Sequence, residues 1–195
     1  MHGTGTESGI KKVVDKWYEE NILDTEYEDL LSIEAGFCGD RTRSTSSSSL
    51  NNLGGTETTA TYYGAYIRLI TNKTPTFECS DEDYDLYTVD ESSRGNHALD
   101  YPVGLITADE VAYAGGVVGS NNTNSSYYLY TNQTYWTMSP LEFVNGYAFV
   151  FIVNNHGSLG NSSVNPTFGV RPVLNIRGDI TISGSGTSTD PYVVS

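Results

Sequence analysis

Hydrophobic residues near the start of the chain recur every three or four positions. Within residues 7–23 this spacing holds for Ile10, Val13, Val14 and Trp17, with Lys and Glu residues on the other side of the repeat. The period predicts an amphipathic helix that buries its apolar side, with Trp17 as a core residue. Packing of the helix on its own domain therefore accounts for these side chains.

A short apolar run at 103–106 leads into the clearest helix start of the chain. Thr107 occupies the N-cap position and Glu110 follows three residues later, which is the pattern of a capping box. Asp109 and Glu110 also suit the positive end of the helix dipole, so capping is expected to account for both carboxylates. Glycines at 115–116 are expected to end the helix, because glycine readily adopts positive φ.

The second half of the chain has patterns typical of strands. Residues 147–153 alternate between two sides, and a strand is also expected at 170–176, where Pro172 places it at an edge or a bulge. Residues 180–182 and 192–194 are expected to form a closing hairpin. On the strand at 147–153, one side carries Ala148, Val150 and Ile152, and the other carries Tyr147, Phe149 and Phe151.

The charge and the length narrow the possible partners. The chain has 195 residues and a formal net charge of −14, so a nucleic acid partner and an anionic membrane surface are both disfavoured. No apolar run reaches the roughly 18 residues of a membrane helix, and no membrane insertion is expected. Residues 1–6 are expected to be a disordered leader or tag, and residues 7–195 a single domain.

Tyrosine is abundant, with 15 copies in a chain rich in Ser, Gly and Asn. Tyrosine supplies a large contact area with few rotatable bonds, so this composition is typical of binding surfaces. The alternative explanation is that tyrosine simply suits β-strands.

Two cysteines, Cys38 and Cys79, are expected to form a disulfide, because the composition is typical of extracellular proteins; two unrelated buried thiols are the alternative. Asp40 and Arg41 are expected to pair with each other and fix the loop beside Cys38. Histidine is scarce, so no metal site is expected, and no cofactor either. The acidic run at 81–90 lacks the glycine and the closing glutamate of a calcium loop, which favours a solvated loop.

Several motifs carry a resemblance to known families. LITADEVAYAGG at 105–116 is similar to a segment of formylglycine-generating-enzyme-like proteins, and GVRPVL at 169–174 resembles their terminal strand. With FCGDR at 37–41 and YWTMSP at 135–140, the order also resembles a group of bacterial surface proteins of unassigned function. The resemblance implies an α+β, C-type-lectin-like fold with small, mostly antiparallel sheets, two or more helices and long loops.

The variable proteins of diversity-generating retroelements also use this fold, and a segment before their closing strand is rewritten at Asn-type codons. The resemblance implies that residues 141–168 form the ligand face. The positions expected to face inward are Ala148, Val150, Val153, Gly157, Leu159 and Val164. The positions expected to face the ligand are Leu141, Glu142, Phe143, Asn145, Tyr147, Phe149, Phe151, Asn155, His156, Ser158, Asn161, Ser163 and Asn165.

The chain departs from two activities of this fold. The C-terminal half lacks the cysteine pair of the oxidase members, so oxidase chemistry is not carried over. Asn165 and Pro166 lack the preceding acidic residue of the calcium-dependent sugar-binding motif. Arg171 in the closing strand is expected to brace it through carbonyl groups, or through a carboxylate such as Asp109 or Glu110.

These observations favour an extracellular or cell-surface binding module, receptor-like or adhesin-like and without catalysis, whose ligand is an unknown protein or a surface glycan. One alternative is the head domain of a pilus-like structural protein; another is a carbohydrate-active enzyme with an unidentified carboxylate pair. Neither a nucleophile elbow nor a phosphate-binding loop occurs. Phe149 and Phe151 would instead be core residues if their strand is covered on both faces.

Overall fold

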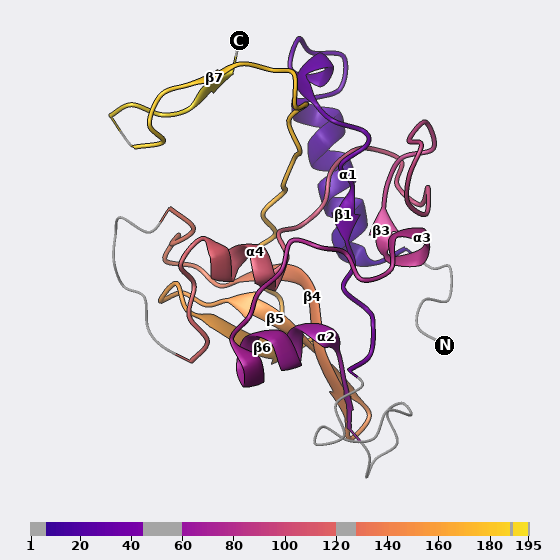
Figure 1. The fold of residues 1–195 in the computed structure, drawn as a ribbon, viewed down its shortest axis with the longest axis vertical. Helices are drawn as coiled ribbons and strands as arrows, with labels where there is room; N and C mark the ends of the chain where they lie inside the picture. Colours follow the sequence, from indigo (N-terminus) through magenta and orange to yellow (C-terminus); the bar gives the residue numbers. More distant parts are fainter. Residues whose placement is uncertain (1–6, 45–59, 120–127, 188, 195) are drawn as a thin grey trace.

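A four-stranded antiparallel sheet lies at the centre of the structure (Figure 1). The computed structural model describes residues 7–44, 60–119, 128–187 and 189–194. The expected leader and most of the serine-rich loop fall outside these residues. In spatial order the strands are β2 (Thr61–Tyr62), β4 (Tyr135–Val144), β5 (Tyr147–Val153) and β6 (Leu159–Ser163).

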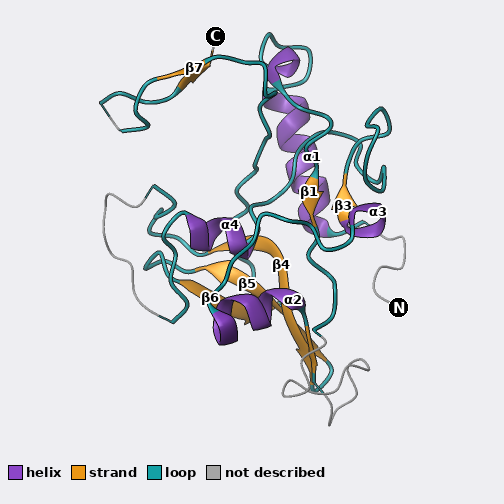
Figure 2. Ribbon diagram, in the orientation of Figure 1, coloured by secondary structure: helices purple, strands orange, loops and turns teal. Residues whose placement is uncertain are grey.

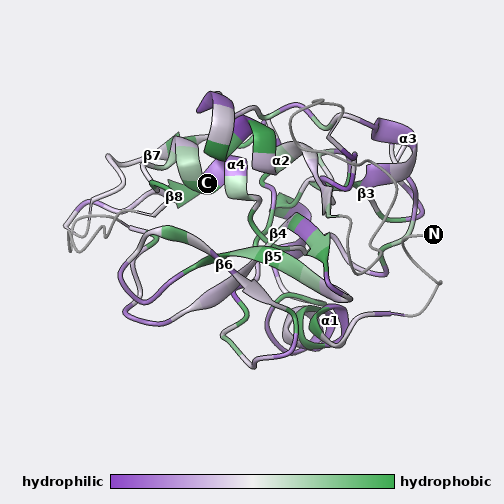
Figure 3. Ribbon diagram, turned by 90° about the horizontal axis from the view of Figure 1, so that it is seen from below, coloured by the Kyte–Doolittle hydropathy of each residue, from purple (hydrophilic) through white to green (hydrophobic). Residues whose placement is uncertain are grey.

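One face of the sheet is covered by α1 (Gly9–Asn21), as Figure 3 shows. The helix begins at Ser8, whose side chain accepts a hydrogen bond from the backbone N–H of Lys11. The predicted helix is confirmed, but its buried stripe is Val14, Tyr18 and Ile22, at a spacing of four residues. Trp17 and Ile10 pack at the margin of this core, and Val13 is exposed. The stripe packs with Trp136 and Ile152 of the sheet.

The opposite face is covered by α2 (Gly64–Tyr66), which continues as the π-helix η3 (Ile67–Asn72), and by α4 (Ala108–Tyr113). Thr107 and Glu110 form the predicted capping box, which is confirmed. The residues of this second core include Ala65, Leu69, Val111, Leu141, Phe151, Val153 and Leu159.

Because helices pack on both faces of the sheet, β5 is a central strand with side chains buried on each face. Phe151 and Val153 pack on the side of α2 and α4, whereas Ile152 packs on the side of α1. The predicted alternation is confirmed, and it separates two apolar environments rather than an interior from a solvent-facing side.

Short elements and loops make up the rest of the described chain (Figure 2). A short 3-10 helix, η1, spans Glu28–Leu30. β1 (Phe37–Cys38) pairs with β3 (Leu86–Tyr87), which directly follows α3 (Glu82–Asp85). The predicted closing hairpin is confirmed as β7 (Ile182–Ser183) and β8 (Val193–Val194).

The strand expected at 170–176 is wrong. This segment makes only isolated bridges, from Val173 to Gly104 and from Ile176 to Leu31. Pro172 lacks the backbone N–H that a continuous ladder needs there. The α+β class with small antiparallel sheets is confirmed.

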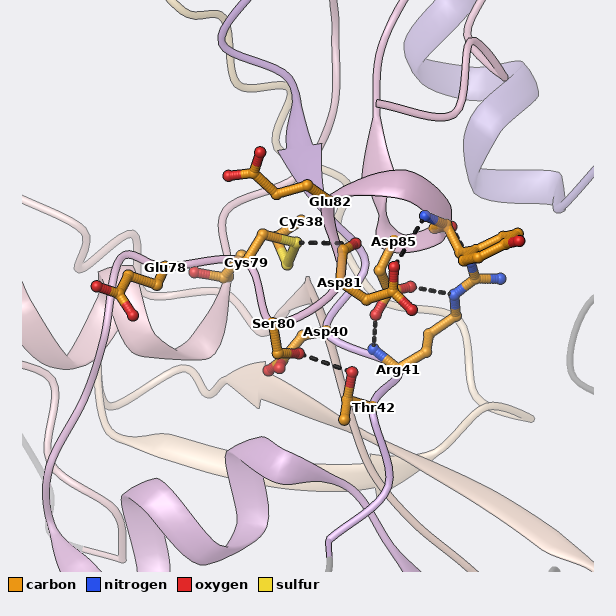
Figure 4. Close-up of a disulfide and its surroundings, with 12 residues drawn as sticks. Cys38, Asp40, Arg41, Thr42, Glu78, Cys79, Ser80, Asp81, Glu82 and Asp85 are labelled. Atoms are coloured by element: carbon orange, nitrogen blue, oxygen red, sulfur yellow. Dashed lines mark hydrogen bonds and ion pairs between the residues drawn. A yellow bond between two sulfur atoms is a disulfide. The ribbon is translucent and has the colours of Figure 1, made fainter. Parts of the chain in front are cut away.

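The disulfide between Cys38 and Cys79 is confirmed (Figure 4). It ties β1 to the loop between η3 and α3, across 41 positions of sequence. The expected pairing of Asp40 with Arg41 is wrong: Arg41 binds Asp85 through its backbone N–H and its Nε, and Asp40 turns to a different arginine, Arg68. Both partners come from segments that are distant in sequence, which local patterns do not reveal.

Candidate functional site

The segment expected to form the ligand face folds as the second half of β4, then β5, β6 and their connections. Strand pairing places one residue from each of the four strands in a single row. Directly paired residues of an antiparallel sheet point to the same face, so these side chains are neighbours. From one edge to the other the row contains Tyr62, Glu142, Phe149 and Ser163.

Glu142 is the charged member of this row. It is the only acidic residue between Glu110 and Asp179, so its surroundings along the chain are neutral. Burial raises the pKa of the Glu142 carboxyl, and a hydrogen bond from Tyr62 opposes part of this rise. The ring of Tyr62 lies 4.2 Å from that of Tyr66, measured between centroids. The row therefore presents one partly desolvated carboxylate among aromatic rings.

The turn between β4 and β5 sets the register of the row. Asn145 and Gly146 both have positive φ, of 51° and 78°, as a two-residue hairpin turn requires. Val144 pairs with Tyr147 across this turn. Tyr147 lies two residues from Phe149, hence on the same face, and its side chain is 54% exposed. We call Tyr62, Glu142, Tyr147, Phe149 and Ser163 the hairpin surface.

An Asn-Gly pair between two apolar runs is a strong sequence signal for a hairpin turn. It could have predicted the end of β4 and the start of β5, and with them the position of Asn145 at the tip. Tyr62 had no comparable signal, because it joins the hairpin surface from a short strand that precedes β4 by more than 70 residues.

Other residues expected at the ligand face lie elsewhere. Asn155 and His156 are exposed, but at the far end of β5, about 20 Å from the hairpin turn at the usual rise of a strand. Phe143 points to the opposite face of the sheet, beside its paired residue Ala148. Asn161 lies exposed on β6, and Asn165 lies exposed just beyond it. The expected residues therefore do not form one continuous surface.

Three of the expected ligand-facing positions are buried, and their expected exposure is wrong. Leu141 and Phe151 are 2% and 1% exposed, because the helices on their face of the sheet cover them. Ser158 is 2% exposed inside a turn, where Asn154 Oδ1 accepts its backbone N–H at 3.3 Å. Phe151 thus fits the alternative of a strand covered on both faces.

The inward positions were mostly predicted correctly. Val153 and Leu159 are fully buried, and Gly157 is buried in the turn after β5. Ala148 and Val150 are half-buried. Val164 is the exception, because it lies after the end of β6 and is exposed.

A second group of charges surrounds Arg68 of η3. Its Nη2 donates to Asp40 at 2.8 Å and to Asp109 at 2.7 Å, and its Nε donates to Asp109 at 2.9 Å. Asp109 also accepts the backbone N–H of Thr76 at 2.9 Å. The expectation that capping accounts for Asp109 is therefore wrong, because this carboxylate is buried and holds two other segments.

Burial raises the pKa of Asp40 to about 6, while Arg68 acts in the opposite direction and Asp109 adds a smaller rise. A cavity of about 200 Å³ lies beside this group, and the disulfide forms part of its wall. Both carboxylates hydrogen bond to the same guanidinium, which favours a structural role. Within the described part of the chain, Arg171 has no carboxylate partner; its Nη1 lies 3.5 Å from the carbonyl oxygen of Leu129, in line with bracing through carbonyl groups.

Within the described ranges, no group of three or more His, Cys, Asp and Glu side chains is arranged to hold a metal ion. The helices of these same ranges fall short of the length and apolarity that a membrane crossing requires.

Comparison with models of protein families, with curated proteins and with solved structures gave no match.

Truncating Phe151 and truncating Tyr147 are expected to have very different effects on stability. Phe151→Ala removes a fully buried ring and should lower the free energy of unfolding by about 3–5 kcal/mol. Tyr147→Ala should change it by less than about 1 kcal/mol, because half of this side chain already faces water. Urea unfolding followed by circular dichroism measures both. Equal losses would contradict the division into core and hairpin surface.

Asp40→Asn is expected to change how stability depends on pH. The folded-state pKa of Asp40 is raised to about 6, from an ordinary 3.8. The Asp40 carboxyl therefore holds its proton more tightly in the folded protein than in the unfolded chain. The protonated carboxyl contributes to the free energy of unfolding in full below about pH 4, and this contribution is lost as the pH rises towards 6. The free energy of unfolding of the wild type, relative to that of the variant, should fall by about 3 kcal/mol over this interval.

Urea titrations of both proteins across this pH range measure the difference. Asp40 faces Arg68, Asp109 and Ser139, all of which are kept in the variant. A difference in stability that does not change with pH would show that Asp40 titrates normally.

Proposed function

We propose that this chain is an extracellular, receptor-like or adhesin-like binding module that contacts its ligand through the hairpin surface. The observation that carries this proposal is the cross-strand row with Glu142 at its centre. Aromatic rings give contact area at a low cost in conformational entropy, and a single carboxylate gives direction to the contact. The ligand is a protein or a surface glycan.

The support beneath the hairpin surface favours binding. The sheet packs against two apolar cores, one on each face, so the strands that carry these side chains are held by tertiary contacts. A surface held in place before binding loses less entropy when a ligand arrives. The disulfide is compatible with an oxidising compartment outside the cell.

We further propose a C-type-lectin-like architecture and a role as the variable protein of a diversity-generating retroelement. The order of the motifs that end at GVRPVL supports this proposal. The exposure of several positions within residues 141–168, around a buried framework, also supports it. The exposed members of the expected ligand face, where replacement would spare the core, are Asn145, Tyr147, Asn155, His156, Asn161 and Asn165.

Two substitutions test the hairpin surface. Tyr147→Ala and Glu142→Gln are each expected to weaken binding by about tenfold or more, as loss of a central contact typically does. Arrays of surface glycans and of cell-surface proteins serve as the source of ligand, and surface plasmon resonance measures the affinity. His156→Ala is the matched control, since its exposed side chain lies at the other end of β5.

An affinity lost on His156→Ala and kept in both hairpin variants would place the ligand elsewhere. A chain that binds no component of either array would contradict a binding role.

Sequencing tests the retroelement proposal. Copies of this gene from related genomes are expected to differ mainly at the six exposed positions given above, because replacement at Leu141 or Phe151 would disrupt the core. A near-copy template beside a reverse transcriptase gene should accompany this variation. Differences spread evenly over residues 7–195 would exclude the proposal.

A further inference from the structure

β6 is an outer strand of the four-stranded sheet, and its backbone has two sides. Hydrogen bonds at its two ends define which side faces β5: the N–H of Asn154 donates to the carbonyl oxygen of Ser158 at 3.0 Å, and the N–H of Val164 donates to that of Ala148 at 3.1 Å. In an antiparallel ladder such pairs recur at every second residue. The even-numbered residues of β6 therefore bond to β5, and the odd-numbered residues turn their N–H and C=O groups outward.

The outward backbone groups at the start of β6 already form hydrogen bonds. The N–H of Leu159 donates to the carbonyl oxygen of Val117 at 3.1 Å, and the N–H of Gly119 donates to the carbonyl oxygen of Leu159 at 3.2 Å. The chain beside Val118 thus runs parallel to the first residue of β6. This contact shows that the outer side of β6 accepts another extended segment.

The outward groups of Asn161 and Ser163 differ from those of Leu159. Neither residue has a backbone partner on its outer side among the residues that the structure describes; the Ser163 carbonyl oxygen accepts only the neighbouring Ser162 hydroxyl, at 3.1 Å. We call the outward N–H and C=O groups of Asn161 and Ser163 the open edge.

The side chains of β6 do not protect the open edge. Exposed edge strands usually carry Lys, Pro or inward charges that prevent pairing with other chains. The residues of β6 after Leu159 are small and uncharged: Gly160, Asn161, Ser162 and Ser163. The first proline is Pro166, beyond the strand. Outward groups that repeat at every second residue match the spacing of another extended chain.

We propose that an extended peptide segment of a partner protein binds as a fifth strand along the open edge of β6. This inference rests on the proposed function and names the class of its ligand. The backbone of the peptide supplies the affinity, as in other cases of β-strand addition. Ser163 is small and shares its row with Phe149, so a long peptide side chain beside Ser163 can lie over the hairpin surface.

The net negative charge of the chain favours a peptide partner that carries positive charge. At a net charge of −14, a peptide with positive side chains is attracted over long range. Two copies of the chain repel each other, which disfavours pairing of β6 with itself.

A displayed library of short linear peptides, selected against the full oxidised chain at low salt, provides the probe. Fluorescence anisotropy of the selected peptides measures affinity. Asn161→Pro is expected to reduce the affinity by about tenfold or more, because proline removes an outward N–H and spares the ladder to β5. The matched control is Asn161→Ala, which should keep the affinity within about threefold, since it changes the side chain at the same position and leaves the backbone N–H in place.

A second measurement uses the unaltered protein, in case the proline variant fails to fold. Selected peptides are N-methylated at alternate residues, in two complementary sets. A strand uses every second amide for one neighbour, so one set should lose binding and the other should keep it. Equal tolerance of both sets would overturn the proposal.

Three other results would also overturn it. These are a library that yields no binder, an equal loss in the alanine control and in Asn161→Pro, and a dimer of the chain that Asn161→Pro abolishes. A glycan that binds in a Tyr147-dependent way but ignores Asn161→Pro would end this inference and leave the proposed function intact.

Discussion

One guanidinium between two buried carboxylates holds the parts of this protein together. Arg68 of η3 binds Asp40, which lies two residues after Cys38 of β1, and Asp109, which lies in the first turn of α4. A hydrogen bond between Asp40 and Ser139 extends the network into β4, and Ser139 Oγ also accepts the backbone N–H of Ala108. Without Arg68, two carboxylates would remain buried without a cation, which is strongly unfavourable.

The network decides which part of the sheet is left for a ligand. By fixing η3 and α4 on one face, while α1 occupies the other, it makes the middle of β5 part of the interior. Among the described residues, the end of the sheet near the Asn145–Gly146 turn stays uncovered, together with the outward backbone groups of Asn161 and Ser163 on β6. The hairpin surface and the open edge adjoin at Ser163, so one ligand can use both.

Local signals in the sequence predicted local structure well. The amphipathic period predicted α1, the capping box predicted the start of α4, and the glycine-rich turn predicted the last hairpin. The ion pairs were not predictable in this way: Arg41 meets Asp85 across 44 positions, and Arg68 meets Asp109 across 41. The adjacent opposite charges of Asp40 and Arg41 suggested an ion pair between them, but in the fold each binds a residue from a distant segment instead.

For the candidate site, the sequence by itself determined which residues alternate and where the chain turns, because these depend on neighbours within a few positions. The exposure of Tyr147 and the burial of Leu141 and Phe151 were decided by the tertiary structure alone. Alternating side chains predict that a strand has two different faces. Only the helices packed on each face determine which face is exposed to water. The row through Tyr62 and Glu142 likewise exists only because β2, from the first half of the chain, pairs with β4.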